Sequence, residues 1–182
     1  MIAYTLFVLA VCVERIVELV VSKRNLAWAF SNGGREYGRG HYPAMVLLHL
    51  ALLVGCIAEV WLTDPPFIPA LGWTMVAIVL AAQGLRWWCI TTLGRRWNTL
   101  IVVVPGLPLV NRGPYRGLRH PNYVAVVAEG IALPMVHTAW ITAITFTVLN
   151  AALLTVRIRA EERALELAVA SPPQPSDAGS RP

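Results

Sequence analysis

The sequence predicts an all-α integral membrane protein with about five transmembrane helices, and two observations carry that prediction. Hydrophobic residues make up 57% of the 182 residues and charged residues only 14%, whereas about a quarter of the residues in a soluble domain are charged. The apolar residues also fall into five runs, separated by polar or proline-containing segments. A chain of this length is expected to form a single folded unit.

The first three apolar runs are long enough to cross a bilayer, and they cover residues 2–21, 43–62 and 69–90. The polar, glycine-bearing segment Ser22–Tyr42 lies between the first two runs, and we expect it to be a loop. Asp64-Pro65-Pro66 predicts a turn after the second run. The first run has neither a basic start nor a small-residue cleavage site, so we expect a retained span rather than a signal peptide.

Several ionisable residues interrupt these runs. Glu14, Arg15 and Glu18 have spacings that place them on neighbouring faces of a helix, where they either pair with one another and with a second helix or contribute to a site. His49 and Glu59 lie in or near the second run, and we expect both to be structural.

The three cysteines give no sign of a metal or redox centre. Cys12, Cys56 and Cys89 all lie in apolar runs without CxxC spacing. We therefore expect them to be small buried side chains, and we expect no metal site.

The segment Thr91–Arg119 is too polar and too often broken by glycine and proline to cross a bilayer. Within it, the apolar pieces Leu100–Val104 and Leu107–Val110 flank Pro105-Gly106, a pattern that predicts a short hairpin at the membrane surface. Irregular backbone at that depth must be covered by protein or line a cavity, because lipid offers it no hydrogen bonds. We therefore expect the hairpin to form the floor of a pocket.

The last two apolar runs, residues 124–135 and 139–156, predict a packed pair of helices, and Arg157–Ala170 continues the second of them as a charged amphipathic helix. We expect three regions in the chain: a membrane region of three spans, a C-terminal region made of an interfacial loop, a helical hairpin and an amphipathic helix, and a disordered tail. They cover residues 1–92, 93–170 and 171–182.

The basic residues set the predicted orientation. In a five-span arrangement, 14 of the 15 Lys and Arg residues fall on one side of the membrane, and that side is the cytoplasm by the positive-inside rule. The net charge of +5 comes from these short clusters between apolar runs, where basic residues set membrane orientation. We therefore expect no binding of nucleic acid. We expect an integral membrane protein with its functional groups facing the cytoplasm.

Two motifs stand at that predicted face. The stretch Gly113–Glu129 reads GPYRGLRHPNYVAVVAE, and Arg157–Leu165 reads RIRAEERAL. In this order, and separated by an apolar helical hairpin, they resemble the isoprenylcysteine carboxyl methyltransferase family and its phospholipid methyltransferase relatives. The resemblance covers roughly residues 93–165 and implies a cytoplasm-facing cofactor pocket at the ends of the last helices.

The resemblance implies transfer of a methyl group from S-adenosylmethionine to an oxygen of a lipid-like acceptor. It places next to the cofactor the residues Tyr115, His120, Pro121, Tyr123, Glu161 and Glu162. It assigns catalytic roles to four residues, with the two arginines facing the acceptor or the cofactor carboxylate: Arg119, His120, Arg157 and Glu161.

These residue types suit that chemistry, although each also has a structural explanation. The cofactor has an amine for Glu161 or Glu162, a carboxylate for an arginine, and an adenine ring for an aromatic face. Alternatively, Arg157 and Glu161 form a helix pair of a few tenths of a kcal/mol. Glu129 either faces the pocket or hydrogen-bonds to another helix.

The acceptor is harder to read from the sequence. The front half, with ERIVELVVSKRN and GGREYGRGHYP, is similar to a bacterial branch associated with type III polyketide synthases. This favours the hydroxyl of a long-chain alkylpyrone or alkylresorcinol, with such a synthase as a pathway partner. The alternatives are carboxyl methylation of a prenylcysteine-like thioether, a sterol-reductase-like NADPH oxidoreductase, and a non-catalytic lipid-binding protein.

Overall fold

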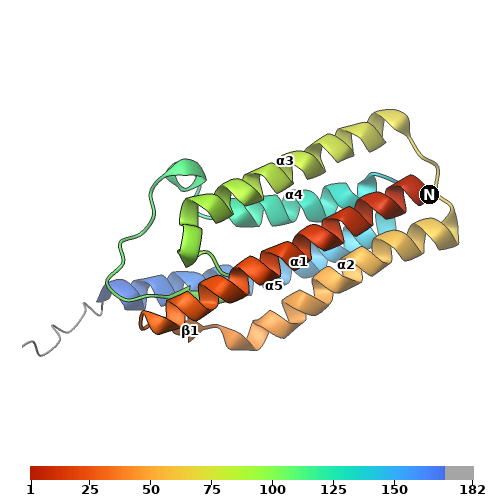
Figure 1. Cartoon of the computed structure of the whole chain (residues 1–182). Helices are drawn as coiled ribbons and strands as arrows, with labels where there is room; N and C mark the ends of the chain where they lie inside the picture. The colour runs from red at the N-terminus through yellow and green to blue at the C-terminus, as the bar shows by residue number, and fades with distance from the viewer. Residues whose placement is uncertain (171–182) are drawn as a thin grey trace, which may run out of the picture.

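The computed structural model describes residues 1–170, and the predicted tail, residues 171–182, lies outside the described residues. Five α-helices form an elongated bundle (Figure 1): α1 (Ile2–Ser31), α2 (Tyr42–Thr63), α3 (Pro69–Leu93), α4 (Pro121–Met135) and α5 (Trp140–Ala170). Three stretches of the described chain are helical, long and apolar enough to cross a membrane: Arg39–Thr63, Pro69–Arg96 and Trp140–Leu167. The prediction of an all-α integral membrane protein is confirmed.

Helix α1 is longer than the sequence suggested. We expected a loop from Ser22 onward, but the helix continues to Ser31, so that prediction is wrong. The segment up to Ser31 contains neither glycine nor proline, and Gly33 is the first residue with a positive φ, at 77°. Polar composition was therefore not enough to predict a loop: Ser22 and Asn25 face other parts of the protein, and Lys23 and Arg24 lie on the exposed side of the same helix.

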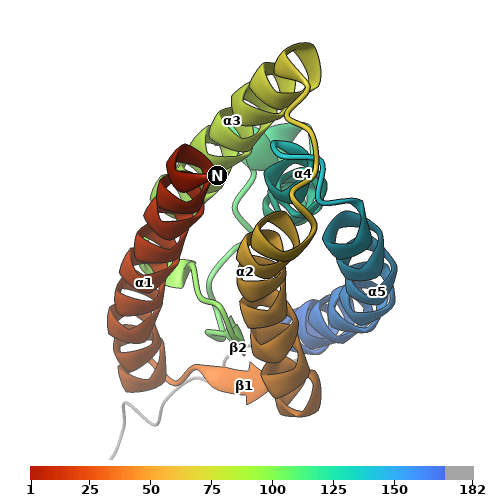
Figure 2. The ribbon, with the colours of Figure 1, turned by 90° about the vertical axis from the view of Figure 1, so that its right-hand side faces the viewer.

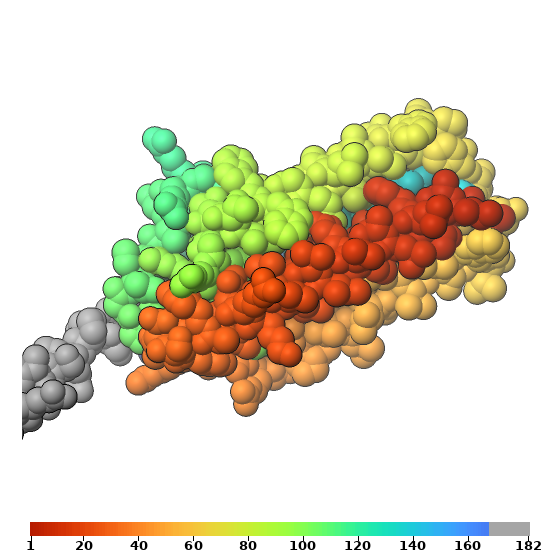
Figure 3. All heavy atoms as spheres, in the orientation of Figure 1, coloured from red at the N-terminus to blue at the C-terminus, as the bar shows by residue number. Residues whose placement is uncertain are grey.

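One face of α1 packs against the bundle, and its residues recur at alternating spacings of four and three. We call this set the α1 stripe: Tyr4, Val8, Val11, Arg15, Glu18, Ser22, Asn25 and Ala29. Its chemistry changes along the helix, from apolar near the N-terminus to charged and then to uncharged polar. The opposite face carries exposed Leu, Ile and Val side chains that suit contact with lipid, and Figure 3 shows α1 along that surface of the bundle.

Helix α4 lies in the centre of the bundle and begins at Pro121, three residues before the predicted start. It has only 15 residues, of which ten are buried, so it packs within protein more than it spans. Gly130 permits a close approach, because a Cβ there would come within 2.0 Å of the ring of Phe146 on α5. The Tyr4 hydroxyl at the start of the α1 stripe donates to the carbonyl of Leu133 at 3.0 Å.

The predicted hairpin of Leu100–Val104 with Leu107–Val110 is wrong. Instead, β2 (Ile101–Val103) pairs antiparallel with β1 (Arg35–Tyr37), which follows α1. The extended α1 brings its C-terminal end to the level of β2, so the partner strand comes from a distant part of the chain. Figure 2 shows both strands at one end of the bundle, away from the N-terminus.

The two residues expected to be structural in the second run have ordinary helix partners. Nδ1 of His49 lies 2.8 Å from the carbonyl oxygen of Met45, one turn earlier. Glu59 accepts from the backbone N–H groups of Ile141 and Thr142, at 3.0 and 2.7 Å. It therefore caps the start of α5 from another helix, where the first N–H groups have no partner of their own. Cys12, Cys56 and Cys89 are free thiols.

Candidate active site

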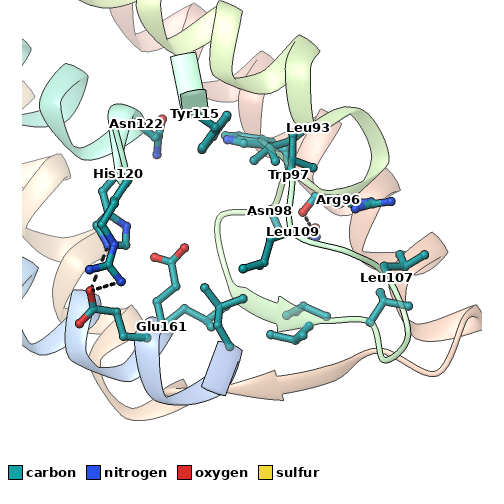
Figure 4. Close-up of a pocket in the computed structure, with 18 of the residues that line it drawn as sticks. Leu93, Arg96, Trp97, Asn98, Leu107, Leu109, Tyr115, His120, Asn122 and Glu161 are labelled. Atoms are coloured by element: carbon teal, nitrogen blue, oxygen red, sulfur yellow. Dashed lines mark hydrogen bonds and ion pairs between the residues drawn. The ribbon is translucent and has the colours of Figure 1, made fainter. Parts of the chain in front are cut away.

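A cavity of about 850 Å³ lies at the end of the bundle where the two strands meet α4 and α5. It brings together all of the residues that the sequence singled out for catalysis or cofactor binding: Tyr115, Arg119, His120, Pro121, Tyr123, Arg157, Glu161 and Glu162. In Figure 4 the carboxylate of Glu161 projects from α5 into the space between His120 on one side and Tyr115, Trp97 and Leu109 on the other.

Local backbone geometry places Tyr115 on the cavity wall. Gly113 opens the short 3-10 helix Gly113–Arg116 with a φ of 56°, and a Cβ there would lie 2.7 Å from the hydroxyl of Thr92 on α3. This close approach fixes the turn against α3. Burial raises the pKa of the Tyr115 phenol above its ordinary value, so the side chain stays neutral and serves as an aromatic surface.

Proline starts α4 and thereby sets the next part of the wall. Pro121 occupies the first turn, where its fixed φ suits a helix and its missing N–H leaves no unmet hydrogen bond. His120 consequently stands just before the helix, and Tyr123 lies within its first turn. The rings of His120 and Tyr123 stack with centroids 5.4 Å apart and planes 23° apart.

The hydroxyl of Tyr123 joins two oppositely charged groups on α5. It donates to a carboxylate oxygen of Glu161 and accepts from Nε of Arg157 at 2.9 Å. The three side chains therefore form one hydrogen-bonded unit across α4 and α5, and all three line the cavity.

Arg157 is a buried cation without a carboxylate partner. Its relative exposure is 7%, and among the described residues no carboxylate lies within ion-pair distance of it. Nη2 donates to the carbonyl oxygen of Thr99 at 2.6 Å, and Nη1 approaches the sulfur of Met45 at 3.5 Å. A buried guanidinium is costly unless an anion neutralises it. This wall of the cavity is therefore suited to an anionic group.

Glu162 lies next to two cationic or ionisable groups at the cavity rim. Its Oε1 is 3.5 Å from Nε2 of His120 and 3.5 Å from Nη2 of Arg119. The side chain of Arg119 is 85% exposed, so it belongs to the mouth of the cavity. Glu161 and Glu162 thus differ in depth, with Glu161 directed inward beside Tyr123.

The opposite wall is almost entirely apolar. It is formed by β2 and the segment that follows it, and its side chains are Leu100, Ile101, Val102, Val103, Val104, Leu107, Leu109 and Val110. The expectation that this segment forms part of a pocket therefore agrees with its position, although its strand pairing differs from the prediction. One cavity thus combines charged and apolar surfaces.

Sequence reasoning assigned no role to several residues at this site. Asn98 and Asn122 line the cavity, and the side-chain oxygen of each is buried without a hydrogen-bond partner. Thr99 supports Arg157 through its main-chain carbonyl, and such a role leaves no signature in the side chain. Asn122 stands inside the RHPNY motif, so its position in that motif was the one available signal.

Glu129 does not belong to this cavity lining; it joins a second set of charges deeper in the bundle. We call this set the bundle cluster, and it consists of Glu14, Arg15, Glu18, Arg86 and Glu129. Oε2 of Glu129 accepts from Arg15 at 2.8 Å and from Arg86 at 2.7 Å. The carboxylate of Glu129 therefore faces α1 and α3. In residues 1–170 no group of three or more His, Cys, Asp or Glu is arranged to hold a metal ion.

The helical fold, with a ligand-sized cavity at one end, defines an integral membrane protein with a binding site, and comparison with known proteins gives its family. A profile of the isoprenylcysteine carboxyl methyltransferase (ICMT) family matches residues 75–167, which include both cavity motifs. The chain is 38% identical over 164 residues to YpbQ, an uncharacterized protein of Bacillus subtilis, covering 90% of this chain and 96% of the relative. An uncharacterized protein of Haemophilus influenzae is 25% identical over 152 residues, covering 83% and 88%. The chain belongs to the ICMT family and is a membrane methyltransferase.

Proposed function

We propose that the cavity binds S-adenosylmethionine and that the enzyme methylates an oxygen of a lipophilic acceptor. When bound, this cofactor supplies a methyl group on a positively charged sulfur. The observation that carries the proposal is the unit formed by Tyr123, Arg157 and Glu161, which presents one positive and one negative group on a single wall. An amino-acid group carries one carboxylate and one amine, and this wall offers a charged partner to each.

The residues present fit the cofactor. Arg157 would hold its carboxylate, because the guanidinium is buried without an ion-pair partner among the described residues. Glu161 would hold its amine, and this role favours Glu161 over the more exposed Glu162. Tyr115 and Trp97 would supply aromatic faces for the adenine ring. Pro121 would close the wall beside them.

His120 is the group that we propose takes the proton of the acceptor. Its Nε2 lies 3.5 Å from Glu162, which would steady the imidazolium that forms. His120 would take the proton as the acceptor oxygen forms its bond to the methyl group, and the bond from that methyl to sulfur would break to leave S-adenosylhomocysteine. Positioning would supply much of the rate of such an in-line displacement. Arg119 at the rim would meet a polar part of the acceptor as it enters.

The acceptor that we propose is the hydroxyl of a long-chain alkylpyrone or alkylresorcinol. The apolar wall formed by β2 and the segment after it supports an acceptor with an alkyl chain. A phenolic or enolic hydroxyl is acidic enough for a single histidine to act as base. Such acceptors are products of type III polyketide synthases, and a synthase of this kind would supply the substrate.

We also propose that the cavity opens to the cytoplasm from a bacterial inner membrane. The basic residues between the predicted spans gather at the cavity end of the bundle, and such residues are retained on the cytoplasmic side. The relatives from Bacillus subtilis and Haemophilus influenzae support a bacterial setting.

Titration calorimetry on the detergent-purified protein tests the cofactor. We expect S-adenosylhomocysteine to bind and NADPH not to bind. Binding of NADPH alone would contradict the methyltransferase cofactor and favour a reductase. Binding of neither ligand would favour a non-catalytic lipid-binding protein.

Methyl transfer from labelled S-adenosylmethionine tests the acceptor. Membranes containing the protein are incubated with an alkylresorcinol, an alkylpyrone or a prenylcysteine thioether, and membranes with His120→Ala serve as the control. We expect label in the two hydroxyl acceptors. Label that enters only the thioether carboxylate would overturn the proposed acceptor while leaving the cofactor proposal intact.

A further inference from the structure

The Arg157 side chain is held in part by a backbone carbonyl of the segment just before β2. The carbonyl oxygen of Thr99 accepts from Nη2 of Arg157 at 2.6 Å, which is the shortest of the hydrogen bonds that the guanidinium makes. Thr99 lies just before β2, in a stretch without helical hydrogen bonds. The place of that carbonyl therefore depends on what holds Thr99 itself.

Ser22 of α1 holds Thr99 by two hydrogen bonds. The backbone N–H of Thr99 donates to Oγ of Ser22 at 2.9 Å, and the two side-chain hydroxyls lie 2.9 Å apart. Ser22 is buried, with a relative exposure of 5%. The hydroxyl of Tyr42 adds a longer contact with Thr99 Oγ1, at 3.3 Å.

Asn25, the next residue of the α1 stripe, fixes the turn that leads into Thr99. Its Nδ2 donates to the carbonyl of Trp97 at 2.7 Å and to that of Gly94 at 3.1 Å. Two neighbouring positions on one face of α1 therefore hold the segment at Gly94, Trp97 and Thr99. Packing alone does not require polar side chains at Ser22 and Asn25, because apolar side chains would fill the same space without the cost of burying polar groups.

We infer that Ser22 is a positioning residue for Arg157 and acts through Thr99, with Asn25 in support. This inference rests on the proposed function, in which Arg157 receives the carboxylate of the cofactor. Loss of the Ser22 hydroxyl leaves the N–H of Thr99 without its acceptor, and the carbonyl that orients the guanidinium shifts with it. The expected defect is therefore specific to ligands that carry a carboxylate.

Two nucleoside ligands distinguish this role from a general loss of structure. S-adenosylhomocysteine carries the amino-acid group, whereas 5′-methylthioadenosine has the same nucleoside and a thioether without that group. We expect Ser22→Ala to weaken binding of S-adenosylhomocysteine about 10-fold and to leave binding of 5′-methylthioadenosine unchanged, as measured by calorimetry. Ser22→Thr, which keeps the hydroxyl, should restore most of the affinity.

Ser31→Ala is the matched control, because it is the same change on the same helix and its hydroxyl bonds only within α1 and its end, to Trp28 and Asn32. It should leave both affinities unchanged. Equal weakening of both ligands by Ser22→Ala, or weakening of neither, would overturn the inference. If Ser22→Ala does not fold, Asn25→Ala provides the same comparison with a smaller expected loss.

The two proposals fail in different ways. A wild-type protein that does not bind S-adenosylhomocysteine overturns the proposed cofactor and this inference with it. A wild-type protein that binds it, together with a Ser22→Ala variant of equal affinity, overturns only the role of Ser22.

Discussion

Two sets of charged side chains lie within this bundle, and they differ in how fully their charges are paired. In the bundle cluster, each carboxylate and guanidinium lies 2.7 to 3.6 Å from an opposite charge on the same or another helix. At the cavity, Arg157 has no such partner among the described residues, and Glu161 is joined only to the hydroxyl of Tyr123. Every charged group of the bundle cluster thus has an oppositely charged neighbour within the protein, whereas Arg157 at the cavity is left to pair with a ligand.

This difference predicts that mutations in the two sets fail in different ways. A change in the bundle cluster should lower stability, and a change at the cavity should lower binding and turnover while the fold remains intact. The predictions below test that division from the largest expected effect to the smallest.

Glu129→Leu should have the largest effect on stability. It removes one of the two carboxylates that contact both Arg15 and Arg86, the other being Glu18. Removal of one partner from a buried ion pair costs about 3–5 kcal/mol. Thermal unfolding in detergent would measure the loss. Glu36→Leu is the control, because Glu36 pairs with the highly exposed Arg39 and a surface pair contributes less than about 1 kcal/mol. Equal effects of the two changes would contradict the division.

Glu161→Gln should have the largest effect on activity. It removes the negative charge proposed to meet the cofactor amine, and we expect about 100-fold weaker binding of S-adenosylhomocysteine with little change in unfolding temperature. Glu162→Gln is the matched control on the next residue, where the side chain lies at the rim and the expected loss is smaller. A larger loss from Glu162→Gln would reverse the assignment of these two residues.

Gly130→Ala separates packing from charge on the same helix as Glu129. The added Cβ would meet the ring of Phe146, and overpacking of this kind costs about 1–3 kcal/mol. Gly84→Ala on α3 meets no atom within 4 Å, so it should be neutral or slightly stabilising. Thermal unfolding of both variants checks the result, and an unchanged Gly130→Ala variant would show that α4 and α5 can move apart at this point.

Glu59→Ala should have the smallest effect. It removes a carboxylate that caps α5 at the end of the bundle far from the cavity, and loss of a helix cap costs about 1 kcal/mol. Affinity for S-adenosylhomocysteine should be unchanged. A weaker affinity would show that the two ends of α5 are coupled, against the division proposed above.

The sequence was sufficient to predict the helices and most of the cavity residues. Long apolar runs identify spans by length and composition, and the motif around His120 and the one beginning at Arg157 each keep their residues close together along the chain. The two motifs could be assigned to the same side of the predicted membrane protein. This was possible because the basic residues between the apolar runs fall on a single side.

What the sequence did not reveal depends on partners that are far apart in the chain. Ser22 and Thr99 are separated by 77 positions, so a helical, buried Ser22 is indistinguishable from a loop residue by local composition. The orientation of Glu129 depends on Arg15 and Arg86, which lie on two other helices. The two paired strands are also far apart in the sequence, because β1 precedes α2 and β2 follows α3. No local sequence pattern predicts their pairing.

The stripe on α1 has a consequence for how the protein is made. Arg15 leaves the ribosome 114 residues before its partner Glu129, which at about 5–20 residues per second is a delay on the order of ten seconds. During that interval the guanidinium of Arg15 has only the glutamates of its own helix and Gln83 of α3 among its final partners. The ion pair that joins α1 to α4 can therefore form only after α4 has been synthesised, so this part of the packing of α1 is completed late.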